Sequence, residues 1–316
     1  MTSQHPHQEP PSTARVARPG RVRLRRRGDR RPLPGVKVLP TLTTLGNLLC
    51  GFGAIYYSAR TGEAAAGTPF GWSTLTIAGA LVFLGMFFDA VDGSVARLTR
   101  STSDLGAQLD SLADMVTFGV APAFMMLRLI SQYYGRGEVI LGPDAGTWYA
   151  KAIWSIAAVY VCCTALRLAR FNAETSSASE KDHRWFKGLP SPGAGGAVAA
   201  LILLHQHMAL VEFAEKGEPA SFAPISALAI PAVTLLCALA MVSRMRYPHF
   251  VNRYLKGRKS FGSVAFLVVV LAAGAWWFHY VLAGALVIYA LSGPFVSLFQ
   301  PRTAAPPHSG AAGPAA

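Results

Sequence analysis

The chain of 316 residues is 52% hydrophobic and only 14% charged, whereas soluble domains carry about 25% charged residues. This deficit of charge excludes an ordinary soluble domain and predicts a membrane protein. The formal net charge of +13 is uneven, because ten of the 29 Lys and Arg residues precede residue 38.

Residues 1–37 are rich in Pro and Arg and show no apolar period, so we expect a disordered basic tail. Such a tail could attract nucleic acid. In a chain that is otherwise apolar, however, the simpler partner is anionic membrane lipid, and we expect no nucleic acid. The basic stretch and the apolar run after it are both too long for a signal peptide.

Apolar runs long enough to cross a bilayer, about 18 residues or more, occur in eight places. They predict transmembrane helices at 38–60, 72–98, 108–132, 148–170, 190–212, 222–243, 262–278 and 281–299. We therefore expect an all-α, polytopic bundle over residues 38–299, with a six-helix core and a final tight hairpin turning at His279 and Tyr280. Residues 300–316, rich in Pro, Ala and Gly, predict a second disordered tail.

The basic residues of the loops predict the orientation of these spans. If the N-terminal tail is cytoplasmic, 24 of the 29 Lys and Arg residues fall on the cytoplasmic side. The other side receives Arg60, Arg128, Arg136, Lys151 and Lys216. The positive-inside rule then predicts an inner-membrane protein with both termini in the cytoplasm and an even number of spans.

Four aspartates interrupt the second and third predicted spans: Asp89, Asp92, Asp110 and Asp114. A carboxylate in a membrane span is costly and indicates a functional site. Asp89 and Asp92 are three residues apart, and Asp110 and Asp114 are four apart, so each pair shares one face of its helix. The turn between the helices is short, which predicts antiparallel neighbours whose carboxylates meet in a cavity open to the cytoplasm.

Four ionised carboxylates would repel one another, so they require cations. Mg²⁺ and Mn²⁺ prefer such oxygen ligands and often bring substrate phosphates with them. Two ions about 3.5–4 Å apart could hold the attacking and leaving oxygens of a phosphoryl transfer, and Arg97 would add a fixed cation for phosphate. Gly93 and Ala96 would let the helices approach, and Gly106 would open the returning helix. The alternative is the ion pathway of a divalent-cation transporter.

The aspartates also belong to a longer pattern, D-x-x-D-G-x-x-A-R-x8-G-x-x-x-D-x-x-x-D, which resembles the signature of the CDP-alcohol phosphotransferases. The matching positions are Asp89, Asp92, Gly93, Ala96, Arg97, Gly106, Asp110 and Asp114. The resemblance implies that an alcohol attacks the β-phosphorus of a CDP-linked lipid and that CMP leaves. It also implies a homodimer.

The resemblance assigns roles to individual residues. Asp89, Asp92 and Asp110 would hold one Mg²⁺ or Mn²⁺ ion. Asp89, Asp110 and Asp114 would hold a second, and Asp114 would also take the proton of the alcohol. The CDP-lipid would contact Gly93, Ala96, Arg97 and Gly106. Asn47 of the first span would either reach the nucleotide or form an interhelical hydrogen bond.

Three further stretches bear on the acceptor alcohol. They are LPTLTTLGNLLCGFGA in the first span, LRLARFNAE followed by WFKGLPSPGAGG, and MVSRMRYPHF. They resemble the membrane-integral, type II phosphatidylserine synthases, which implies CDP-diacylglycerol and L-serine as substrates. The same chemistry on glycerol 3-phosphate or an inositol phosphate is the alternative.

A serine pocket needs a cation for the carboxylate and an acceptor for the ammonium group. Arg167 and Arg170 are suited to forked recognition of a carboxylate, with positive-inside anchoring as the alternative for each, and Arg170 is the preferred candidate. Asn172 offers both a donor and an acceptor. The KGLPSP segment can present backbone amides at a helix start, and Lys187 within it could bind phosphate or lipid headgroups.

Overall fold

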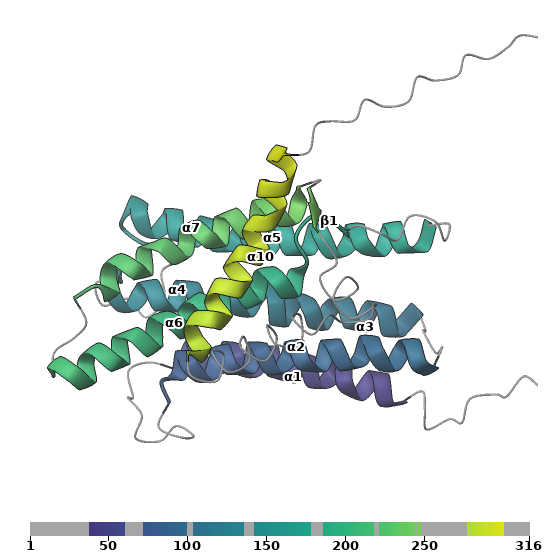
Figure 1. Ribbon diagram of the computed structural model, residues 1–316, viewed down its shortest axis with the longest axis horizontal. Helices are drawn as coiled ribbons and strands as arrows, with labels where there is room; N and C mark the ends of the chain where they lie inside the picture. The colour runs from purple at the N-terminus through teal and green to yellow at the C-terminus, as the bar shows by residue number, and fades with distance from the viewer. Residues whose placement is uncertain are drawn as a thin grey trace, which may run out of the picture.

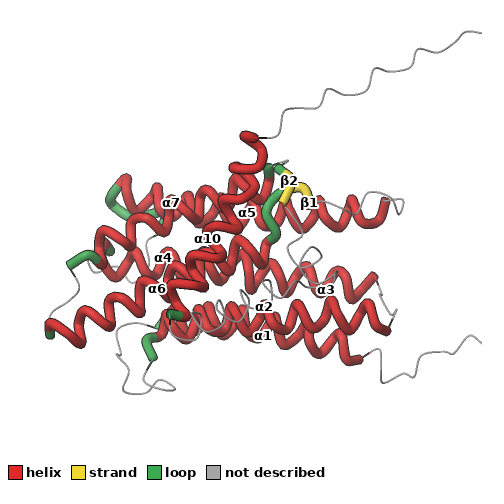
Figure 2. The backbone as a smooth tube through the Cα atoms, viewed as in Figure 1, coloured by secondary structure: helices red, strands yellow, loops and turns green. Residues whose placement is uncertain are grey.

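The computed structural model describes residues 38–60, 72–99, 104–135, 142–177, 186–217, 221–243, 245–247 and 277–299. The predicted tails and most of the predicted span at 262–278 lie outside these ranges. Helices make up nearly all of the described chain (Figures 1 and 2). They are α1 (Val38–Ala59), α2 (Thr74–Thr99), α3 (Asp104–Asp114), the π-helix η3 (Met115–Val120), α4 (Ala121–Tyr134), α5 (Trp148–Ser177), α6 (Ser191–Lys216), α7 (Ala223–Val242) and α10 (Phe278–Phe299).

Five helical segments of the described chain are long and apolar enough to cross a membrane. They are Thr74–Ser94, Leu105–Tyr134, Trp148–Glu174, Ser191–Lys216 and Ala223–Val242. These segments coincide with the second to sixth predicted spans, so the expected all-α, polytopic membrane bundle is confirmed. The first predicted span is present as α1, although it is not among these five.

The predicted hairpin turn at His279 and Tyr280 is wrong. Helix α10 begins at Phe278, and the amide of Val281 donates to the carbonyl of Trp277 over 3.0 Å, so both residues lie in the first helical turn. The ring of His279 stacks on that of His207 in α6, with centroids 4.2 Å apart. The contact joins the start of α10 to α6.

The third span, formed by α3, η3 and α4 in sequence, is the most buried of the five. It lies against the small-residue start of α6, where a Cβ added to Gly195 would meet the Cα and the carbonyl oxygen of Phe118 at 3.0 Å. Small residues permit such close backbone approach in membrane bundles. The span that carries two of the four aspartates is therefore held by packing on most sides.

A π-helix follows Asp114 directly. The amide of Ala121 donates to the carbonyl of Val116, five residues earlier, which is the π pattern. The hydroxyl of Tyr160, fully buried in α5, donates to the carbonyl of Phe118 over 2.9 Å. Such π-segments occur often at functional sites, and this one separates the acidic part of the span from its apolar part.

Two very short strands join the start of α6 to the end of α7. In the antiparallel pair of β1 (Phe186–Lys187) and β2 (Arg246–Tyr247), Lys187 lies opposite Arg246. The chain continues with a hydrogen bond of 2.8 Å from the amide of Gly188 to the carbonyl of Met245. Gly188 has φ +87° and lies against the carbonyl of Met241, so a side chain there would be strained and would clash.

Candidate functional site

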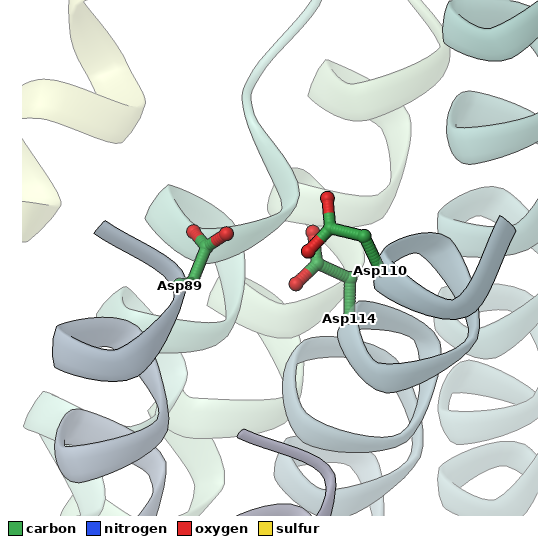
Figure 3. Close-up of side chains that lie close together, drawn as sticks. All are labelled: Asp89, Asp110 and Asp114. Carbon is green, nitrogen blue, oxygen red and sulfur yellow. The ribbon is translucent and has the colours of Figure 1, made fainter. Parts of the chain in front are cut away.

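Three of the four aspartates converge at one end of the bundle. Asp89 projects from α2, and Asp110 and Asp114 project from α3 on the facing side (Figure 3). Each offers one carboxylate oxygen, and these oxygens all lie within 4.8 Å of one another. Asp114 is buried, while Asp89 and Asp110 are partly exposed. The residue spacing therefore correctly predicted which faces of α2 and α3 point toward each other.

The helices that carry these aspartates are not packed tightly together as the sequence suggested. They run antiparallel (Figure 1), but α1 packs along both of them, while α2 and α3 make little direct contact. A Cβ added to Gly93 would meet nothing within 4 Å, so this glycine does not serve helix approach. The space beside Gly93 is therefore open.

Asp92 stands apart from the group of three. It lies on α2, one turn beyond Asp89, and its two oxygens accept hydrogen bonds from different hydroxyls of α1. Thr43 Oγ1 donates to Oδ1 over 2.9 Å and Thr44 Oγ1 donates to Oδ2 over 2.9 Å. Asp92 is thus not among the three carboxylates gathered within 4.8 Å, but it lies close enough to interact electrostatically with Asp89 and Asp110.

Asn47 forms the interhelical hydrogen bond that the sequence left open as one of two alternatives. Its Nδ2 donates to Oδ1 of Asp114 over 3.1 Å, and its side chain is fully buried between α1 and the third span. A fully buried side chain presents no surface to a nucleotide. The structure thus places the amide of Asn47 against Asp114, inside the bundle.

Arg167 is the arginine of α5 that faces the carboxylates. Its Nη1 donates to Oγ of Ser191 at the start of α6 over 2.8 Å, and it interacts electrostatically with Asp89 and Asp114. Its Nε is buried and makes no hydrogen bond within the described part of the chain. One polar edge of this guanidinium therefore remains for another partner.

Arg170, the preferred candidate from the sequence, points elsewhere. Its Nε pairs with Oε1 of Glu174 over 2.9 Å, and the two side chains are 36% and 51% exposed. This is an ordinary ion pair one turn apart on a helix surface. The structure therefore directs Arg167, and not Arg170, toward the aspartates.

The remaining sequence candidates fall into two groups. Nδ2 of Asn172 donates to Oγ of Ser111 over 2.9 Å, which ties α5 to α3 next to Asp110. Gly106 lies partly buried in the first turns of α3. The backbones of Ala96, Arg97 and Lys187 are in α2 and β1, but their side chains lie outside the part of the structure that is described.

The charge balance of the site favours a bound cation. Two carboxylates about 4 Å apart repel by about 4 kcal/mol at an effective dielectric constant of about 20. Among the described side chains, Arg167 is the cation that interacts with Asp89 and Asp114. One positive charge does not balance three carboxylates. The carboxylate oxygens themselves are the hard ligands that divalent ions such as Mg²⁺ and Mn²⁺ prefer, so the donor set fits such an ion.

The chain is similar to known proteins over the same region. The CDP-alcohol phosphatidyltransferase family model matches residues 37–241. A CDP-diacylglycerol–serine O-phosphatidyltransferase of Helicobacter pylori is 30% identical over 219 residues, which cover 69% of this chain and 75% of that protein. The Bacillus subtilis protein of the same name is 29% identical over 219 residues, with 67% and 90% of the two chains covered.

A third protein of that name, from Methanocaldococcus jannaschii, is 34% identical over 174 residues, or 55% of this chain and 64% of that protein. The matched residues 37–241 contain α1 to α6, almost all of α7 and every side chain of the acidic site. The family model covers well over half of the chain. The chain therefore belongs to the CDP-alcohol phosphatidyltransferase family.

Proposed function

We propose that this membrane enzyme transfers the phosphatidyl group of CDP-diacylglycerol to the hydroxyl of L-serine and releases CMP. The observation that carries the proposal is the convergence of Asp89, Asp110 and Asp114 within 4.8 Å. The acceptor is supported by the relatives, which are named as CDP-diacylglycerol–serine O-phosphatidyltransferases. The family membership and this name together define a phospholipid-synthesising transferase.

Two divalent cations, Mg²⁺ or Mn²⁺, would be held by the aspartates. Asp89, Asp110 and Asp114 would hold one of them, and these are the carboxylates that the structure gathers. Asp89, Asp92 and Asp110 would hold the other. When bound, such ions neutralise the carboxylates and polarise the phosphates between the attacking and leaving oxygens.

Asp114 is the proposed general base. It lies deepest in the site, and Asn47 engages its Oδ1, which leaves Oδ2 to accept the hydroxyl proton of serine. The serine oxygen then forms a bond to the β-phosphorus, which bears the diacylglycerol. The bond from that phosphorus to the bridging oxygen breaks, and CMP leaves with the bond's electron pair.

Arg167 is the proposed ligand of the serine carboxylate. Its Nη1 is held by Ser191, and its buried Nε makes no hydrogen bond in the described chain. A guanidinium recognises a carboxylate through two parallel hydrogen bonds. Because Arg167 interacts with Asp114 as well, the carboxylate of serine would be held close to the base that takes its proton.

The CDP-lipid would lie in the open space beside Gly93, against α2 and the first turns of α3. Gly93, Ala96, Arg97 and Gly106 are the proposed contacts, by family resemblance. Asn172 and Lys187 remain proposed contributors to the acceptor side. The loop charges support an inner-membrane location with both termini and the site cytoplasmic, and the resemblance supports a homodimer.

The decisive test is an acceptor panel with purified protein, CDP-diacylglycerol and Mn²⁺ or Mg²⁺. We expect CMP release with L-serine and formation of phosphatidylserine. CMP release with glycerol 3-phosphate or an inositol phosphate, but not with serine, would overturn the choice of acceptor. Metal flux in liposomes without any CDP-lipid turnover would instead indicate a cation transporter.

A further inference from the structure

Helix α1 carries a polar face in an otherwise apolar span. Thr43 and Thr44 lie three to four residues before Asn47, so the three side chains share one side of the helix. Each of them donates a hydrogen bond of 2.9–3.1 Å to an aspartate of the proposed metal site. Helix α1 therefore contacts the site through hydrogen-bond donors and contributes no carboxylate of its own.

The two threonines restrict the rotation of the Asp92 carboxylate. Each hydroxyl takes a different oxygen of the carboxylate, so rotation of the group would break both bonds. A carboxylate oxygen has a second lone pair, so each oxygen can still ligate an ion. Thr44 is 3% exposed, which keeps water from competing for its hydrogen bond.

Asn47 is confined by contacts on two sides, although its own Oδ1 is buried without a hydrogen bond in the described chain. The hydroxyl of Thr117 donates to the backbone carbonyl of Asn47 over 2.9 Å. On the other side, a Cβ added to Gly85 would lie 2.8 Å from Oδ1 of Asn47, so α2 presses closely on the amide. The carboxylate of Asp114 needs a donor, and this contact fixes Nδ2 on that side.

We propose that Thr43, Thr44 and Asn47 are positioning residues, which aim the oxygens of Asp92 and Asp114 at the divalent ions without touching substrate. The inference rests on the proposed function, because it concerns the same metal site. Partners that orient metal ligands typically change metal affinity or activity by about 10- to 100-fold when removed. The three side chains form one unit, because a single rigid helix presents them all.

Direct metal binding tests the threonine part. Mn²⁺ is titrated into the purified, full-length protein without CDP-diacylglycerol, and free Mn²⁺ is followed by electron paramagnetic resonance. We expect Thr43→Val combined with Thr44→Val to weaken binding of one ion about tenfold or more, and Ser at both positions to restore it. Thr234→Val is the matched control, because within the described residues that buried hydroxyl bonds only the carbonyl of Ile230 in α7.

A double-mutant cycle shows whether the threonines act through Asp92. In an Asp92→Asn background, the two Val substitutions should cause no further loss of Mn²⁺ affinity. Unchanged affinity in the Val variant, or an equal further loss in the Asp92→Asn background, overturns the inference. Wild-type protein that binds no Mn²⁺ would instead contradict the metal site of the proposed function.

Steady-state kinetics test Asn47. Asn47→Ala should lower kcat about tenfold or more and leave KM for CDP-diacylglycerol unchanged, because the amide lies beneath the carboxylates rather than at the lipid. A raised KM for CDP-diacylglycerol with kcat preserved would overturn the assignment and restore a nucleotide contact. Thermal unfolding of the same variants identifies any loss of folded protein.

Discussion

The two ends of the bundle use polar side chains in opposite ways. At the end away from the aspartates, Nε2 of His205 lies 3.0 Å from the hydroxyl of Tyr133, and Nδ1 lies 2.9 Å from that of Ser226. Ser226 also donates to the carbonyl of Ala223 over 3.1 Å. If the Ser226 proton goes to that carbonyl, the tautomer that satisfies every atom has Nδ1 of His205 donating and Nε2 accepting from Tyr133. Every polar atom of this imidazole is paired.

At the acidic end, the like-charged groups Asp89, Asp110 and Asp114 are brought together and balanced only in part. The neutral network joins α4, α6 and α7 and contributes to stability, while the carboxylates oppose their own assembly. The comparison indicates that one end is built for the fold and the other for a charged ligand. Variants at the two ends should therefore separate activity from stability.

Asp114→Asn should have the largest effect. Loss of a general base typically costs about 10²- to 10⁴-fold in rate, so CMP release should fall into that range or below detection. The melting temperature should be unchanged or higher, because one of three repelling charges is gone. Parallel assays of CMP release and thermal unfolding check this. Activity close to wild type would remove Asp114 from the role of base.

Arg167→Lys should rank second. Lysine keeps the charge but cannot form the forked pair with a carboxylate, so we expect KM for serine to rise about tenfold or more, or about 1.4 kcal/mol. The matched control is Arg170→Lys, whose side chain pairs with Glu174 on the exposed face of the same helix. An equal effect of both substitutions would show that Arg167 contributes only membrane anchoring.

Gly93→Ala and Gly85→Ala compare an open position with a packed position on the same helix, α2. The new methyl group at residue 93 meets no protein atom, so stability should hold while activity falls as the methyl enters the space proposed for the CDP-lipid. At Gly85 the methyl would lie 2.6 Å from Cγ2 of Thr117, so the melting temperature should drop. Thermal unfolding should separate the two variants, with a lower melting temperature for Gly85→Ala only, while steady-state kinetics should show that Gly93→Ala loses activity at full stability.

Tyr133→Phe should have the smallest effect on catalysis. It removes the hydroxyl that donates to His205 and leaves a buried ring nitrogen unpaired, which costs about 1–3 kcal/mol of unfolding free energy. Turnover per folded molecule should stay within about twofold of wild type, since this variant leaves the acidic site intact. A large loss of turnover at full stability would contradict the division between the two ends.

The sequence predicted much of the acidic end because helix periodicity assigns faces. The spacing of Asp89, Asp110 and Asp114 was enough to bring the right faces together. Periodicity gives no distance between helices, so the separation of α2 and α3 and the open space at Gly93 were not predicted. It also failed to separate Arg167 from Arg170, because residues three apart differ by only about 60° around a helix, and the packing of α5 decides which of them faces the aspartates.

Other features carried a weaker signal or none. Polar residues 43, 44 and 47 on one face of an apolar span could have indicated a contact with the aspartates. The π-helix after Asp114 has no composition that distinguishes it from an α-helix, and its hydrogen bond from Tyr160 comes from a distant part of the chain. The pair of short strands likewise depends on two segments that are far apart in sequence.

The π-helix also changes the direction in which α3 presents its side chains relative to α4. The aspartates of α3 must face α2, while the apolar residues of α4 must face the centre of the bundle, and an uninterrupted helix would fix one phase from the other. Removing one residue from Met115–Val120 would turn the acidic segment by about 100° relative to α4. The extra residue therefore sets the angle between the carboxylates of α3 and the apolar face of α4.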